Sequence, residues 1–82
     1  MQITIERMAG ANFQLEVEKE DSVESIKSKI YKILSIEPNL QRLVYNGQLM
    51  LEDKAISAYN IQEGDVIHLS IWSTGSGAYR EI

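Results

Sequence analysis

The sequence predicts an α+β domain in which a single helix packs on one face of a mixed sheet. Segments near both ends of the chain alternate apolar and polar residues, as half-buried strands do. Between them, one stretch repeats apolar residues at the spacing of an amphipathic helix. The 82 residues of the chain give room for one hydrophobic core only. The helix is therefore expected to pack against strands that precede and follow it.

The first two strands are expected over residues 1–7 and 12–18. The odd-numbered residues are apolar from 1 to 5 and again from 13 to 17, and the residues between them are polar. This period of two places the apolar side chains on one face of each strand. Gly10 lies between the two segments and can adopt the left-handed conformation of a turn, so the strands are expected to form a hairpin.

The helix is expected from about Val23 to Leu34. Asp21 and Ser22 both favour the N-cap position, and Glu24 follows Asp21 by three residues, as in a capping box. Pro38 cannot continue the helix, so the chain has to turn there and return to the sheet. The apolar residues at helical spacing are Val23, Ile26, Ile30, Ile33 and Leu34.

A second hairpin is expected after the helix. Leu43 and Tyr45 are candidates for the buried face of a third strand. The strand ends at Asn46-Gly47, a dipeptide typical of tight hairpin turns, and residues 48–50 are expected to form its short partner.

The last strand is expected over residues 66–72, where apolar residues alternate again. Residues 73–77 have the glycine- and serine-rich composition of a linker, and residues 78–82 show no periodic pattern. The sequence thus predicts a domain over residues 1–72 and a flexible tail or linker after it. Five strands and one helix in this order are typical of the β-grasp architecture.

Composition and charge limit the classes of partner. The chain has 8 basic and 12 acidic residues, and its net charge of −4 disfavours nucleic acid and anionic membranes as partners. The acidity either only keeps the domain soluble or also steers a basic partner, and charge alone does not decide between the two. The chain has no cysteine, signal-peptide pattern or long apolar run, so a monomer in the cytoplasm or nucleus is expected.

Catalysis is not expected from these residues. His68 is the only histidine, and it falls on the exposed face of a strand, where a general base would lack a pocket and an orienting partner. Acidic pairs such as Glu16 with Glu18 are expected to be solvated. The carboxylates show no recognised metal-ligand spacing, and no cofactor motif is present. No catalytic, cofactor or metal site is therefore predicted.

Five stretches of the chain resemble the ubiquitin family in one continuous register. They are Met1-Gln2-Ile3, Leu15-Glu16-Val17-Glu18, Gln41-Arg42-Leu43, Tyr59-Asn60-Ile61-Gln62 and His68-Leu69. The similarity extends from the first residue to about residue 72 and includes both core and surface positions. The resemblance implies a ubiquitin-like β-grasp fold.

The resemblance also bears on the tail and on the lysines. Family members that are joined to lysines need a C-terminal di-glycine with a free carboxylate, whereas this chain has Gly75-Ser76 followed by six more residues. The lysines used most for ubiquitin chains correspond to Gln48 and Glu63. Lys27 and Lys29 remain on the helix and are expected to be structural, with their stems on apolar surface and their ammonium groups in water. Conjugation through this tail is not expected.

The main recognition face of the family is partly kept. By strand alternation Val44 and His68 point away from the core. Ser70 removes an apolar contact from this face, and Leu49 adds one at its rim. The predicted protein-binding residues are Met8, Arg42, Val44, Gly47, Leu49, Val66, His68, Ser70 and Trp72.

Trp72 stands where activating enzymes of the family prefer an arginine, and two interpretations of it stay open. It is either an aromatic anchor for a partner, beside Arg42, or a lid that folds back over the core. A cluster of exposed apolar side chains favours binding, because monomeric domains seldom display one without a partner.

A kept face with a lost tail implies a non-conjugated protein-interaction module that acts as an adaptor in the ubiquitin pathway. The expected partners are ubiquitin-binding domains or proteasome receptor subunits, which would lay the apolar stripe of a helix on the face. The alternative is a covalent modifier, joined to target lysines after C-terminal processing. A thioester with an activating enzyme would discriminate the two.

Overall fold

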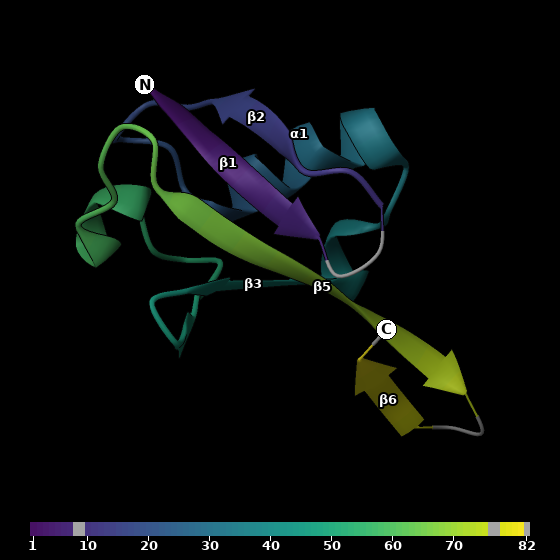
Figure 1. Ribbon diagram of the computed structural model, residues 1–82. Coiled ribbons are helices and arrows are strands. Elements are labelled where there is room, and N and C mark those ends of the chain that lie inside the picture. The colour runs from purple at the N-terminus through teal and green to yellow at the C-terminus, as the bar shows by residue number, and fades with distance from the viewer. Residues whose placement is uncertain (8–9, 76–77, 82) are drawn as a thin grey trace.

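A computed structural model of the protein describes the backbone of residues 1–7, 10–75 and 78–81, and the side chains of residues 1–7 and 10–71. The chain begins with two strands, continues through the helix and then supplies the remaining strands (Figure 1). The elements in chain order are β1 (Gln2–Arg7), β2 (Phe13–Glu16), α1 (Val23–Leu34), the 3₁₀ helix η1 (Pro38–Leu40), β3 (Gln41–Tyr45), β4 (Gln48–Leu49), the 3₁₀ helix η2 (Ile56–Tyr59), β5 (Val66–Gly75) and β6 (Ala78–Glu81).

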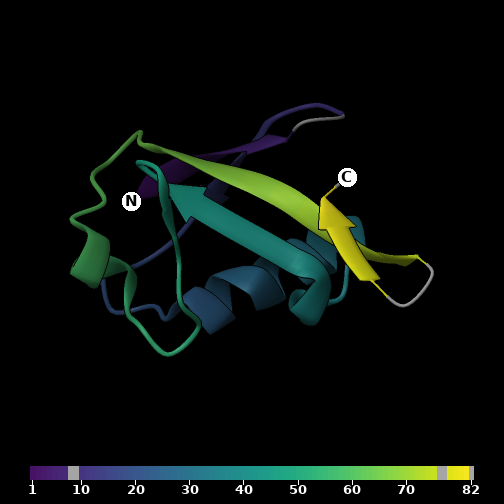
Figure 2. The ribbon, with the colours of Figure 1, turned by 90° about the horizontal axis from the view of Figure 1, so that it is seen from below.

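The main sheet has the strand order β2-β1-β5-β3-β4. β1 pairs antiparallel with β2 and parallel with β5, and β3 pairs antiparallel with β5 and with β4. Figures 1 and 2 show α1 lying across one face of this sheet and leaving the other face uncovered. The predicted α+β fold, a mixed five-stranded sheet with one helix, is confirmed.

The predicted second hairpin is also confirmed, and its turn explains its register. Asn46 and Gly47 have φ values of 52° and 81°. Two successive positive φ values are what a type I′ turn requires, and asparagine and glycine adopt them most readily. The turn places Val44 opposite Leu49.

The structure shows which of two adjacent residues, Asp21 or Ser22, is the N-cap of α1. The hydroxyl of Ser22 accepts a hydrogen bond from the backbone N–H of Ser25 at 3.0 Å, as an N-cap side chain does. The carboxylate of Asp21 instead accepts from the backbone N–H of Glu18 at 3.0 Å. Ser22 is therefore the cap, and Asp21 closes the turn before it.

The helix packs on the sheet through a narrower stripe than its apolar pattern suggests. Ile33 is 52% exposed, although it recurs at helical spacing with the buried residues. A period of 3.6 residues that starts at Val23 passes close to Ile30 and Leu34, so Ile33 falls at the margin of the stripe. The buried residues of α1 are Val23, Ile26, Lys27 and Ile30.

Two of the lysines on α1, Lys27 and Lys29, are bound within the domain. The side chain of Lys27 is 8% exposed, and its Nζ lies 3.0 Å from Glu52 Oε1. The prediction that this ammonium lies in water is wrong, because a carboxylate from the loop after β4 reaches over to it. Lys29 Nζ donates to the carbonyl of Glu16 at 2.9 Å and to the Asp21 carboxylate at 3.0 Å. Both residues contribute to structure.

The core lies between α1 and the covered face of the sheet. It draws on the apolar face of each long strand and on the segments that frame the helix. Its members are Ile3, Ile5, Leu15, Val17, Val23, Ile26, Ile30, Leu43, Met50, Ile56, Ile61, Ile67 and Leu69.

The last strand is longer than the sequence predicts. β5 continues from Trp72 to Gly75 and pairs there with β6, so that Trp72 lies opposite Glu81 and Gly75 opposite Ala78. This β5–β6 hairpin projects beyond the end of the main sheet (Figure 1). Residues 73–75 show no apolar alternation, so periodicity could not predict this extension of β5. A domain boundary after Trp72 stays a prediction.

Candidate protein-binding surface

The uncovered face of the sheet carries a row of side chains fixed by strand register. Val44 in β3 lies between His68 of β5 on one side and Leu49 of β4 on the other. The residue before it, Leu43, is fully buried, so alternation directs Val44 to the uncovered face. Val66 precedes His68 by two residues on the same strand and therefore shares this face.

These side chains are accessible to differing degrees. Leu49 is 49% exposed and Val66 is 37% exposed, while Val44 is half-buried between its two neighbours. The His68 side chain is 54% exposed. We name Val44, Leu49, Val66 and His68 the sheet-face patch.

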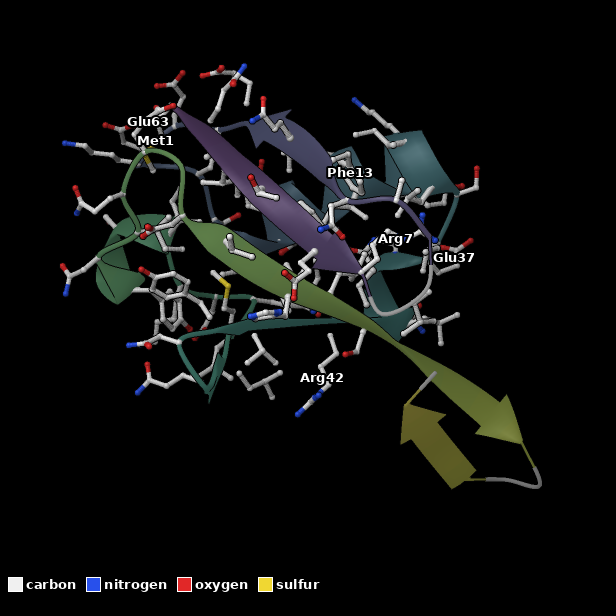
Figure 3. All side chains as sticks on the ribbon, viewed as in Figure 1. Met1, Arg7, Phe13, Glu37, Arg42 and Glu63 are labelled. Atoms are coloured by element: carbon white, nitrogen blue, oxygen red, sulfur yellow. The ribbon has the colours of Figure 1, made fainter. Side chains whose placement is uncertain are left out.

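The remaining predicted site residues lie differently. Gly47 is exposed in the turn after β3, and Arg42 is half-buried on β3, with its side chain extending away from the strand (Figure 3). Ser70 is only 6% exposed, so it does not belong to the open part of the face, although alternation places it beyond His68. Met8 and the Trp72 side chain lie outside the described residues. Both interpretations of Trp72 stay predictions.

A carboxylate that sequence reasoning missed lies beside the patch. His68 Nδ1 is 2.9 Å from Glu6 Oε1, and both side chains are about half exposed. The parallel pairing of β1 with β5 brings the two residues opposite each other. Because the pairing joins strands that are far apart in the sequence, no local sequence pattern predicts the contact. The polar rim of the patch thus has an acidic as well as a basic group.

A hydrogen bond between side chains connects β3 to the residue just before β5, at one end of the patch. The Tyr45 hydroxyl donates to Asp65 Oδ2 at 2.6 Å, and the backbone N–H of Gln62 donates to the same oxygen at 2.9 Å. These bonds favour the carboxylate, so the Tyr45 hydroxyl first and the Gln62 amide second lower the pKa of Asp65. The same bond raises the pKa of the Tyr45 phenol. Asp65 therefore connects β3 to the turn before β5.

This bond predicts that the effect of Tyr45→Phe on stability depends on pH at both extremes. A lowered pKa of Asp65 stabilises the fold above its unfolded value, and that contribution is lost as the pH falls through the folded pKa. A raised pKa of Tyr45 stabilises the fold below its unfolded value, and that contribution is lost as the pH rises through the folded pKa. The loss of unfolding free energy in Tyr45→Phe should be constant between about pH 5 and 9 and shrink outside that range.

Urea unfolding of both proteins across this pH range measures the difference. Tyr59→Phe is the matched control, because the Tyr59 hydroxyl accepts from the backbone N–H of Leu51 at 2.7 Å and contacts no carboxylate through that bond. Its effect should not change at acid pH. An equal acid dependence in both variants would contradict the assignment to Asp65.

The segment after β4 contributes a depression that sequence reasoning also missed. It has a volume of about 510 Å³ and is lined by Gln48, Leu49, Leu51, Lys54, Ala58 and Tyr59. Leu51 is 50% exposed and follows the buried Met50. Leu51 lies beyond the end of β4, so only the structure could show that it extends the apolar surface beyond the sheet.

The side chains of this surface are of the kinds that bind other proteins. Across the described ranges, no three His, Cys, Asp or Glu side chains gather as a metal site. In the part of the chain covered by the structure, no helix has the length and apolar character needed to span a membrane. Half-exposed apolar side chains with charged groups at their edge are typical of protein-binding surfaces.

Known proteins are similar to this chain over most of its length. A model of the ubiquitin family matches residues 3–73. Ubiquitin-like protein 1 of Schizosaccharomyces pombe is 33% identical over 69 residues, which cover 84% of this chain and 88% of that protein. Ubiquitin-like protein NEDD8 of Dictyostelium discoideum is 32% identical over 69 residues, covering 84% and 90%. Large proline-rich protein bag6-A of Xenopus laevis is 38% identical over 69 residues, covering 84% of this chain but 6% of that protein.

Proposed function

The chain belongs to the ubiquitin family, and from this premise we propose that it is a non-conjugated recognition domain. Its partners are ubiquitin-binding domains or proteasome-type receptors, and it docks them through the sheet-face patch. The domain acts as an adaptor and has no catalytic role. Members of this family are in general not enzymes.

The observation that carries the proposal is the accessibility of the sheet-face patch. Leu49 and Val66 expose 49% and 37% of their surface on a face that α1 leaves uncovered. A small monomeric domain gains nothing in stability from apolar surface that stays in water, whereas a partner helix that covers it gains binding free energy. His68 and Arg42 at the edge offer polar contacts to such a helix.

The tail supports a role without conjugation. The chain has Gly75-Ser76 where conjugated family members have two glycines, and further residues follow. Gly75 is also paired with Ala78 in the β5–β6 hairpin. A tail that enters the narrow channel of an activating enzyme has to be single and extended, so this pairing would have to open first.

A covalent modifier is the second candidate, and two of the relatives support it. The S. pombe and D. discoideum proteins are ubiquitin-like proteins, and the match covers 88% and 90% of them. The bag6-A match, by contrast, occupies 6% of a large protein, as a domain within a longer chain would. Processing to a free glycine would be required for conjugation.

The test is a titration of the ¹⁵N-labelled domain with a ubiquitin-binding helical module and, separately, with a proteasomal ubiquitin receptor. Amide shifts centred on Val44, Leu49 and His68 are expected for at least one of them, because a helix docked on the patch changes the surroundings of these residues. Absence of shifts with both would contradict the proposal. A thioester with ubiquitin-activating enzyme and ATP would instead support the covalent modifier.

A further inference from the structure

The depression after β4 is continuous with the sheet-face patch. Leu49 belongs to both, since it lies opposite Val44 in the sheet and also lines the depression. From there the apolar surface continues through Leu51 to Ala58 and the Tyr59 ring. A partner that covers Val44 and Leu49 can therefore also contact the depression, because the two areas share Leu49.

The wall of the depression is held in place by the fold. The Tyr59 hydroxyl accepts a hydrogen bond from the Leu51 amide at 2.7 Å. Met50, the residue before Leu51, is 2% exposed, and its amide donates to the Leu43 carbonyl at 2.8 Å. Leu51 nevertheless keeps 50% of its surface in water. A fixed wall with exposed apolar surface binds a guest side chain with little loss of conformational freedom.

Lys54 gives the depression a positive charge on an acidic domain. Among the described residues of the lining it is the one that carries a charge, while the whole chain has a net charge of −4. The nearby Glu52 is held by Lys27 at 3.0 Å. Within the part of the chain that the structure describes, no carboxylate lies within ion-pair distance of the Lys54 ammonium. A ligand with an apolar group and a neighbouring carboxylate is complementary to this site, because the apolar group matches the leucines and the carboxylate matches Lys54.

We propose that the depression is a second anchor point for the partner helix and selects its sequence. The depression binds one large apolar side chain of the helix, and a Glu or Asp one helical turn from that side chain forms an ion pair with Lys54. Residues three or four apart lie on the same side of a helix, about 5–6 Å apart, so one helix can supply both groups. The inference rests on the proposed function, because the same helix covers the sheet-face patch.

A charge exchange tests the role of Lys54. The probes are two synthetic amphipathic helical peptides with the same apolar stripe. The first has a glutamate one helical turn beyond the end of the stripe, and the second has a lysine at that position. The wild-type domain should bind the glutamate peptide at least about threefold more tightly, as an exposed ion pair allows, and Lys54→Glu should reverse the preference. Fluorescence anisotropy measures each affinity.

Truncation of the wall tests the apolar pocket. Leu51→Ser should weaken binding of the glutamate peptide by at least about fivefold, in the range of a side chain that is buried on binding. Ile33→Ser is the matched control, because Ile33 is 52% exposed on α1, close to the 50% of Leu51, and lies away from the patch. It should bind as the wild type does.

The outcomes separate the inference from the proposed function. If Val44→Glu abolishes peptide binding while Leu51→Ser and Lys54→Glu bind both peptides as the wild type does, the inference is wrong and the proposed function stands. If the wild type binds neither peptide, nor any receptor in the titration, both fail. If sedimentation shows a dimer that Leu51→Ser dissociates, the occupant is a second copy of the chain and the partner assignment is overturned.

Discussion

Replacing Val44 with glutamate is expected to weaken binding of a ubiquitin-binding helix by at least about tenfold while the domain stays folded. Val44 lies between Leu49 and His68 on the uncovered face, so a docked helix would bury the new carboxylate without a partner. The free domain keeps this position half-exposed and can solvate the charge. Titration of the helix and a circular dichroism melt of the variant measure the two effects.

Ser28→Glu is the control for the added charge, because Ser28 is exposed on α1, which covers the opposite side of the sheet. It should leave the affinity unchanged. Equal weakening by both variants would mean that net charge, and not the patch, governs binding. An unfolded Val44→Glu domain would show that the side chain contributes to the core.

Substitution of Leu43, the residue before Val44, should lower stability and leave binding nearly unchanged. Leu43→Ala is expected to lower the free energy of unfolding by about 2–5 kcal/mol, as removal of a core leucine does. Leu43 is fully buried and is packed with the core under α1. Binding by the folded fraction should change little, since the side chain does not reach the sheet-face patch. Urea unfolding gives the stability, and the titration gives the affinity.

Leu49→Ala provides the comparison for the stability effect. Leu49 is 49% exposed, so its truncation removes less buried surface and leaves no closed cavity. A loss below about 1 kcal/mol is expected. If the two leucine variants lost equal stability, the assignment of Leu43 to the core would be contradicted.

The fold could be predicted because its signals are local. The alternation in β1 and β2, the apolar stripe of α1 and the Asn46-Gly47 turn each act over a few residues, and each agrees with the structure. The same alternation directed Val44 to the uncovered face. The resemblance to the ubiquitin family then implied the β-grasp fold, which periodicity alone does not supply.

The features that the sequence did not predict depend mainly on contacts between segments far apart in the chain. Glu6 meets His68 only because β1 and β5 are parallel neighbours, and Lys27 finds Glu52 only after the loop returns to the helix. Ser70 is buried although alternation places it on the same face as His68, because alternation predicts the face of a side chain and not its exposure. Leu51 lies beyond the end of β4, and its place in the depression depends on Ala58 and Tyr59, which come later in the chain. Local patterns contain no information about such contacts.

The parallel pairing of β1 with β5 also sets the order in which this chain can fold. The middle of the sheet joins Thr4 to Val66 and Arg7 to Leu69, so its formation requires closure of a loop that contains almost the whole domain. The β1–β2 hairpin and α1 can form early during synthesis on the ribosome, but their apolar faces stay open until β5 emerges. The sheet-face patch, which needs β3 and β5 side by side, is complete only at that last step.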